Sequence, residues 1–119
     1  SLVFVSSTYG LVGPDHRIYD KERFKSIPAY SATKAGVIGL ARWLSTWLGK
    51  FSVRVNVVTP GGVYNDHSKS FKKKYSQKTP LNRMANPKEM NGILAYLMSD
   101  SSSYATGQNF IIDGGFTAW

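Results

Sequence analysis

The amino-acid sequence predicts an α/β fold built on a doubly wound parallel sheet. Three short apolar segments have the length and composition of buried strands. They alternate with two longer segments in which apolar residues recur with the helical period. In such a strand–helix–strand–helix–strand succession, each helix joins two parallel strands. We expect both of these connections to be right-handed.

The strands are expected at Leu2–Ser6, Val53–Val58 and Asn109–Ile112. The first is short, apolar and rich in valine, which is typical of a strand buried on both faces. The second ends at Pro60-Gly61-Gly62, where the two glycines let the backbone approach a ligand closely. Gly114-Gly115 ends the third strand.

The helices are expected at Pro28–Leu48 and Pro87–Ser99. Pro28 suits the first turn of a helix, because its fixed φ angle is helical and its missing N–H is not needed there. The apolar stripe of the first helix is wide and includes Trp43 and Trp47. A stripe this wide predicts burial on two sides, against the sheet and against another subunit.

Two polar connections separate these elements. Ser7–Pro28 is long for a compact domain, and such connections are usually functional or mobile. Asp66–Gln77 is expected to form a short helix or a flexible lid. A cluster of basic residues lies in or beside it and contributes to the net charge of +8: Lys69, Lys72, Lys73, Lys74 and Lys78. The cluster is interpreted as a solvated helix face, with attraction of a phosphorylated or nucleotide-bearing substrate as the alternative.

Composition narrows the class of protein. The chain of 119 residues is long enough for one small domain, and it contains no cysteine, which excludes disulfide and thiolate chemistry. This composition suits a reducing compartment, and we expect a cytoplasmic location. No apolar run is long enough to span a bilayer. His16 and His67 lack companions at metal-ligand spacing, so no metal is assigned. We expect neither a membrane nor a nucleic-acid partner.

One pair of residues points to acid–base chemistry. Tyr30 and Lys34 lie four apart in the first predicted helix, which places them on one face. A lysine ammonium favours the phenolate form of a neighbouring tyrosine, and a phenol that exchanges protons near neutral pH is a general acid and base. Ser7, at the end of the first strand, would hold a substrate oxygen against it. Ser6 is the competing candidate, but Ser7 directly precedes the turn and is preferred.

The order of the motifs strongly resembles the carboxyl-terminal half of the short-chain dehydrogenase/reductase family, from Leu2 to Gly115. The motifs that carry this resemblance are Ser7, Tyr30 with Lys34, Pro60-Gly61-Gly62-Val63, Tyr104–Gly107 and Asp113-Gly114-Gly115. The resemblance implies a Rossmann-type sheet and hydride transfer between an alcohol or carbonyl and NAD or NADP. It also implies that Ser7, Tyr30 and Lys34 are catalytic. Tyr30, Lys34 and the loop Pro60, Gly61, Gly62 and Val63 would contact the cofactor.

The substrate implied by the resemblance is a small molecule, either sugar-derived or acyl. Two other functions stay open: an isomerase or dehydratase of the extended family, which also uses Tyr-x-x-x-Lys, and a non-catalytic basic binding module. Relatives pair the helix that carries the tyrosine between subunits, so we expect a homotetramer or a homodimer.

The chain also departs from the family pattern. It has no Gly-x-Gly-x-x-Gly turn for the pyrophosphate, the link from Ser7 to Pro28 contains an apparent insertion, and Asn65 stands where many relatives have threonine. We therefore expect residues 1–119 to be the carboxyl-terminal part of a single NAD(P)-binding domain whose amino-terminal part is missing. On its own, this part is expected to be inactive.

Overall fold

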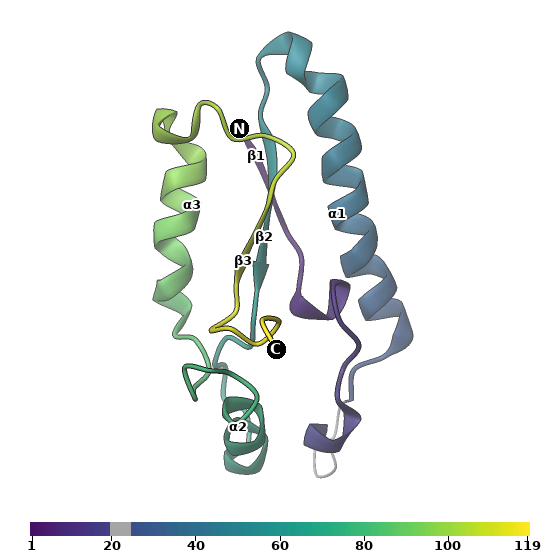
Figure 1. Cartoon of the computed structure of the whole chain (residues 1–119), viewed down its shortest axis with the longest axis vertical. Coiled ribbons are helices and arrows are strands. Elements are labelled where there is room, and N and C mark those ends of the chain that lie inside the picture. Colours follow the sequence, from purple (N-terminus) through teal and green to yellow (C-terminus); the bar gives the residue numbers. More distant parts are fainter. Residues whose placement is uncertain (20–24) are drawn as a thin grey trace.

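The computed structural model describes residues 1–19 and 25–119 and contains a parallel sheet of three strands in the order β1-β2-β3 (Figure 1). The strands are β1 (Leu2–Val5), β2 (Val55–Pro60) and β3 (Asn109–Ile112). Helix α1 (Pro28–Leu48) joins β1 to β2, whereas α2 (Lys69–Ser76) and α3 (Asn91–Met98) lie between β2 and β3. The predicted α/β class with a doubly wound parallel sheet is confirmed.

The predicted bounds hold for α1 and β3, while those of the other elements shift. β2 begins at Val55 because Leu2, the first residue of β1, pairs there, and it extends to Pro60 because β3 pairs with its last residues. The second predicted helix divides into two parts. Pro87–Met90 form a 3-10 turn, capped by Asn86, and the α-helix starts only at Asn91.

The expectation of two right-handed connections is wrong for one of them. Val55 and Val57 pack against α1, whereas Arg54, which lies next to Val55 in the sequence, donates hydrogen bonds to the carbonyls of Leu97 and Ser99 at the end of α3. α1 and α3 therefore lie on opposite faces of the sheet, as Figure 1 shows. The three strands lie side by side in chain order, so both connections move across the sheet in the same direction. One passes over one face through α1 and the other over the opposite face through α3, which gives the two connections opposite hands. β2 is buried on both faces, so each face needs a covering helix.

Helix α1 carries more apolar surface than the sheet covers. Ile38 and Ala41 are buried against β2. On the other side of the helix, Leu40 is 49% exposed, Trp43 60% and Trp47 52%, and the two indole rings lie 5.5 Å apart.

Among the described residues, no helix combines the length and the apolar character that crossing a membrane requires.

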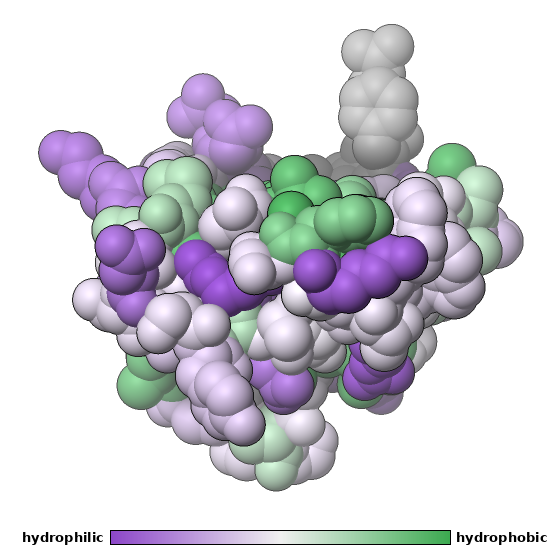
Figure 2. Space-filling view, turned by 90° about the horizontal axis from the view of Figure 1, so that it is seen from above, coloured by the Kyte–Doolittle hydropathy of each residue, from purple (hydrophilic) through white to green (hydrophobic). Residues whose placement is uncertain are grey.

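The amino and carboxyl ends of the strands lie at opposite ends of the molecule. The end seen from above in Figure 2 carries the amino terminus and the turn after α1, and there hydrophilic residues surround smaller hydrophobic groups. The carboxyl ends of the strands point to the opposite end, beside α2 (Figure 1). In parallel α/β sheets ligands bind outside the carboxyl ends of the strands, so a ligand site is expected at this end.

Candidate active site

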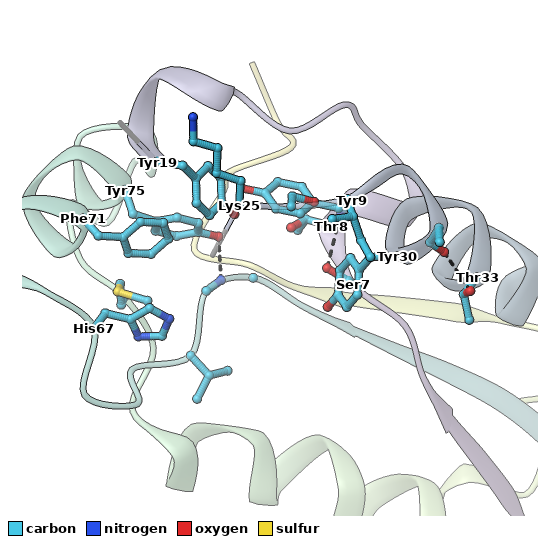
Figure 3. A pocket seen from close by; sticks show the side chains of 17 residues that line it. Ser7, Thr8, Tyr9, Tyr19, Lys25, Tyr30, Thr33, His67, Phe71 and Tyr75 are labelled. Atoms are coloured by element: carbon cyan, nitrogen blue, oxygen red, sulfur yellow. Dashed lines mark hydrogen bonds between the residues drawn. The ribbon is translucent and has the colours of Figure 1, made fainter. Parts of the chain in front are cut away.

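A cavity of about 610 Å³ lies at the carboxyl ends of β1 and β2 (Figure 3). One side is formed by Ser7, which follows β1, and by Tyr30 in the first turn of α1. Another side is the segment Gly61–Val63 after β2, and α2 contributes Phe71 and Tyr75. The fold thus brings together Ser7, Tyr30, Gly61, Gly62 and Val63, five of the seven residues predicted for the site. Lys34 and Pro60 lie beside the cavity and not in its lining.

The two candidate serines have different surroundings. Ser6 is buried, and its hydroxyl donates a 2.7 Å hydrogen bond to the carbonyl of Lys34 in α1. Ser7 lines the cavity, and its Oγ accepts the N–H of Tyr9 at 3.2 Å. Gly10 lets the chain approach the backbone of α1 closely, because a Cβ at this position would lie only 2.7 Å from the carbonyl carbon of Lys34. Ser6 and Gly10 therefore hold the chain after β1 against α1, which leaves Ser7 facing the cavity.

Tyr30 and Lys34 lie on one face of α1, as their spacing predicts. The Tyr30 side chain lines the cavity, and within the described part of the chain its hydroxyl has no hydrogen-bond partner. The ammonium nitrogen of Lys34 lies 5.7 Å from the centre of the Tyr30 ring. It donates a 3.0 Å hydrogen bond to the carbonyl of Val5, the last residue of β1. The phenol is thus available to a ligand, with a positive charge close to its ring.

The loop after β2 offers backbone groups to the cavity. Gly62 and Tyr64 pair with Ala85: the N–H of Ala85 donates to the carbonyl of Gly62, and the N–H of Tyr64 donates to the carbonyl of Ala85, each at 2.9 Å. Val63, between them, bridges to Ala85 in parallel fashion, so its own N–H and C=O face away from that strand. Within the described residues, neither group of Val63 has a hydrogen-bond partner.

Phe71 and Tyr75 of α2 form an aromatic wall of the cavity beside the loop after β2, which was not predicted from the sequence. The Tyr75 hydroxyl accepts the N–H of Gly62 at 2.5 Å, and the ring stacks between those of Phe71 and Phe116 at centroid distances of 5.9 and 5.1 Å. The sequence signal was the spacing of four between Phe71 and Tyr75, which places both rings on one face of α2. The predicted short helix or lid is therefore an ordered helix whose aromatic side closes the cavity.

Three tyrosines that line the cavity, Tyr9, Tyr19 and Tyr75, are poor candidates for proton transfer. Burial raises the pKa of Tyr9, with a further contribution from its hydrogen bond to Tyr19. Burial is also the main cause of the raised pKa of Tyr19 and of Tyr75. The hydroxyl of Tyr19 donates to that of Tyr9 at 2.9 Å. These three phenols stay protonated at neutral pH and are engaged in hydrogen bonds within the protein.

The basic cluster has structural contacts. Lys78 forms an ion pair with Asp15 at 2.5 Å, and Lys72 lies over the ring of Tyr64 at 4.8 Å. Arg17 also binds Asp15, and these two cations hold the pKa of the Asp15 carboxyl well below its usual range. Lys74 of α2 also donates a hydrogen bond to the carbonyl of Arg17 at 3.2 Å, so the cluster ties α2 and the turn after it to the chain that follows β1. No group of three or more metal-ligating side chains among the described residues is placed to hold a metal ion.

Comparison with known proteins gives consistent matches. Residues 18–117 match the family described as Enoyl-(Acyl carrier protein) reductase. The D-arabinitol 2-dehydrogenase (ribulose-forming) of Candida tropicalis is 43% identical over 99 residues, which cover 76% of this chain and 35% of that protein. The trans-4-hydroxycyclohexanecarboxylate dehydrogenase of Sinomonas cyclohexanicum is 40% identical over 118 residues, which cover 99% of this chain and 41% of that protein.

A solved structure also matches this chain over most of its length. The short chain dehydrogenase from Leptospira borgpetersenii with bound NAD+ superposes with a TM-score of 0.90 at 40% identity, covering 97% of this chain and 43% of that one. The chain therefore spans less than half the length of each of these three proteins, at 35%, 41% and 43%.

The contact between Tyr75 and Gly62 generates a prediction. Replacing Tyr75 by Phe keeps the stacked ring but leaves the half-buried Gly62 N–H without its acceptor, which costs about 0.5–1.5 kcal/mol. We expect the free energy of unfolding, measured by denaturant titration, to fall by this amount, and the Gly62 amide to exchange faster with deuterium. Tyr104→Phe is the matched control, because Tyr104 is fully exposed. Equal stability of the two variants would show that the contact contributes nothing.

Proposed function

The chain belongs to the short-chain dehydrogenase/reductase family, and we propose that the protein containing it is an NAD(P)-dependent oxidoreductase that interconverts an alcohol and a carbonyl compound. The observation that carries this proposal is the cavity in which Ser7 and Tyr30 face the backbone of the loop after β2. The bound NAD+ of the Leptospira structure supports the cofactor class. The dehydrogenases among the relatives support the type of reaction.

The residues beside the cavity fit a nicotinamide. The free N–H and C=O of Val63 are one donor and one acceptor, the pair that a carboxamide needs. Gly61 and Gly62 keep this segment close to its neighbours, because a Cβ on either would lie within 3 Å of Asp113 or Tyr75, at 2.8 and 2.6 Å. When bound, the nicotinamide supplies or accepts the hydride, while the protein positions the substrate and moves the proton.

In the proposed mechanism, Tyr30 is the general acid and base. During oxidation, the deprotonated Tyr30 oxygen takes the proton from the substrate hydroxyl as the carbon loses its hydride. During reduction, the same oxygen returns a proton to the alkoxide. Ser7 Oγ donates a hydrogen bond to the substrate oxygen. The ammonium of Lys34 lies 5.7 Å from the centre of the Tyr30 ring, and it holds the end of β1 through its hydrogen bond to Val5.

We further propose that residues 1–119 form the carboxyl-terminal part of a single NAD(P)-binding domain. The support is the coverage of the structural match, which includes 97% of this chain and 43% of the Leptospira protein. The experiments on activity therefore use the complete gene product that contains this chain.

The test of the reaction is the replacement of Tyr30 by Phe in that gene product. Loss of the proton relay should lower kcat by roughly 10²–10⁴-fold with little change in NAD(H) affinity, since the ring and the fold remain. Tyr96→Phe, on the exposed side of α3, serves as the control. Turnover close to wild type in the Tyr30 variant would refute the assignment.

We also propose that the protein forms a homodimer or homotetramer through α1. Its outer face exposes Trp43 and Trp47, large apolar side chains of the kind that symmetric interfaces bury. Trp47→Glu should shift the complete protein to a smaller species in light scattering across a dilution series, before the subunit unfolds. Tyr104→Glu, an exposed aromatic position outside α1, should leave the assembly unchanged. A wild-type protein that stays monomeric and active at micromolar concentration would contradict the proposal.

A further inference from the structure

The cavity has one polar end and a largely apolar wall. The hydroxyls of Ser7 and Tyr30 lie at the polar end, where the proposed reaction takes place. The wall consists of Phe71, Met84, Ile27 and the rings of Tyr9, Tyr19 and Tyr75. Each of these three phenol groups already forms a hydrogen bond within the protein, so the wall offers fewer polar groups than a polyol would need. A polyol, with a hydroxyl on every carbon, would bury several of its polar groups against this wall without partners.

His67 interrupts the apolar wall with an oriented hydrogen-bond donor. Its ring stacks on that of Phe71 at a centroid distance of 4.9 Å and an angle of 15°. Its Nδ1 accepts the N–H of Asn65 at 3.2 Å, so the neutral ring carries its proton on Nε2. Within the described residues, Nε2 has no protein partner, and the ring lines the cavity (Figure 3). Both protonation states of His67 thus present an N–H to a ligand.

Two further groups in the lining of the cavity favour an anion. Ser26 Oγ is buried at the cavity and has no hydrogen-bond partner in the described part of the chain, an arrangement that a ligand atom would satisfy. Lys25 adds a positive charge at the lining. The described lining residues include no aspartate or glutamate.

Resting on the proposed function, we propose that the substrate is an alcohol or ketone on an alicyclic or aromatic body that carries a carboxylate, and that His67 binds this carboxylate. The apolar wall covers the body of the substrate, and the hydroxyls of Ser7 and Tyr30 hold the reacting oxygen. His67 is then a specificity-determining residue: it selects hydroxy or oxo acids over polyols through its Nε2–H and takes no part in proton transfer.

The first test measures binding without turnover. Cyclohexanecarboxylate, which has no hydroxyl to oxidise, is titrated by calorimetry into the complete gene product with NAD+ present. His67→Phe keeps the ring stacked on Phe71 but removes the N–H donor, and it should weaken binding at least about tenfold, as expected for the loss of a charge-assisted hydrogen bond. His16→Phe, which replaces a histidine outside the cavity, should bind like the wild type. Equal affinity of all three proteins would overturn the proposal.

The second test separates recognition from reaction. The kcat/KM of the wild type should be higher for 4-hydroxycyclohexanecarboxylate than for cyclohexanol or a pentitol. His67→Phe should lower only the value for the acid, mainly through KM. A preference for the pentitol, or an equal loss on the acid and on cyclohexanol, would contradict the role of His67. Carboxylate binding that depends on His67 without oxidation of any alcohol would support this inference and refute the proposed reaction.

Discussion

The hydrogen bond from the Gly62 N–H to the Tyr75 hydroxyl is the contact on which the cavity depends. It joins α2 to the loop after β2, and its length of 2.5 Å requires glycine at position 62, because a Cβ would lie 2.6 Å from the Tyr75 ring. The same ring stacks on Phe116 near the end of the chain. Three segments distant in sequence thus meet at one side chain, and together they fix the wall opposite Ser7 and Tyr30.

The geometry singles out Tyr30 among the tyrosines of the cavity without reference to its motif. Tyr9, Tyr19 and Tyr75 are engaged in hydrogen bonds, and burial raises the pKa of each. Tyr30 is the cavity tyrosine whose hydroxyl has no partner in the described part of the chain, and a lysine ammonium lies near its ring. A general acid and base must be able to contact the substrate oxygen, and an unpartnered hydroxyl in the cavity meets this requirement.

Periodicity and motif spacing could predict α1 with its bounds, β3, and the meeting of Ser7 with Tyr30, since these depend on local patterns. The face that each helix covers could not be predicted, because an amphipathic pattern shows that a helix has an apolar side and not which side of the sheet it packs on. Tyr75 was missed because its segment is rich in lysine and was interpreted as a solvated helix face. Its partner Gly62 lies in the loop after β2, and no local sequence pattern shows that these two segments meet. Ser7 was preferred over Ser6 because it directly precedes the turn, and the contact of Ser6 with Lys34 gives this preference a structural reason.

We propose that Ser7, Tyr30 and Val63 act together on one substrate and one cofactor within this cavity. A crystal structure of the complete gene product with NAD(H) and an unreactive carbonyl analogue would test this arrangement. We expect the analogue oxygen to lie within roughly 2.6–3.2 Å of both Ser7 Oγ and Tyr30 Oη, with the carboxamide on the Val63 backbone. An analogue bound outside the cavity, or with its oxygen on other groups while Tyr30 turns away, would refute the arrangement.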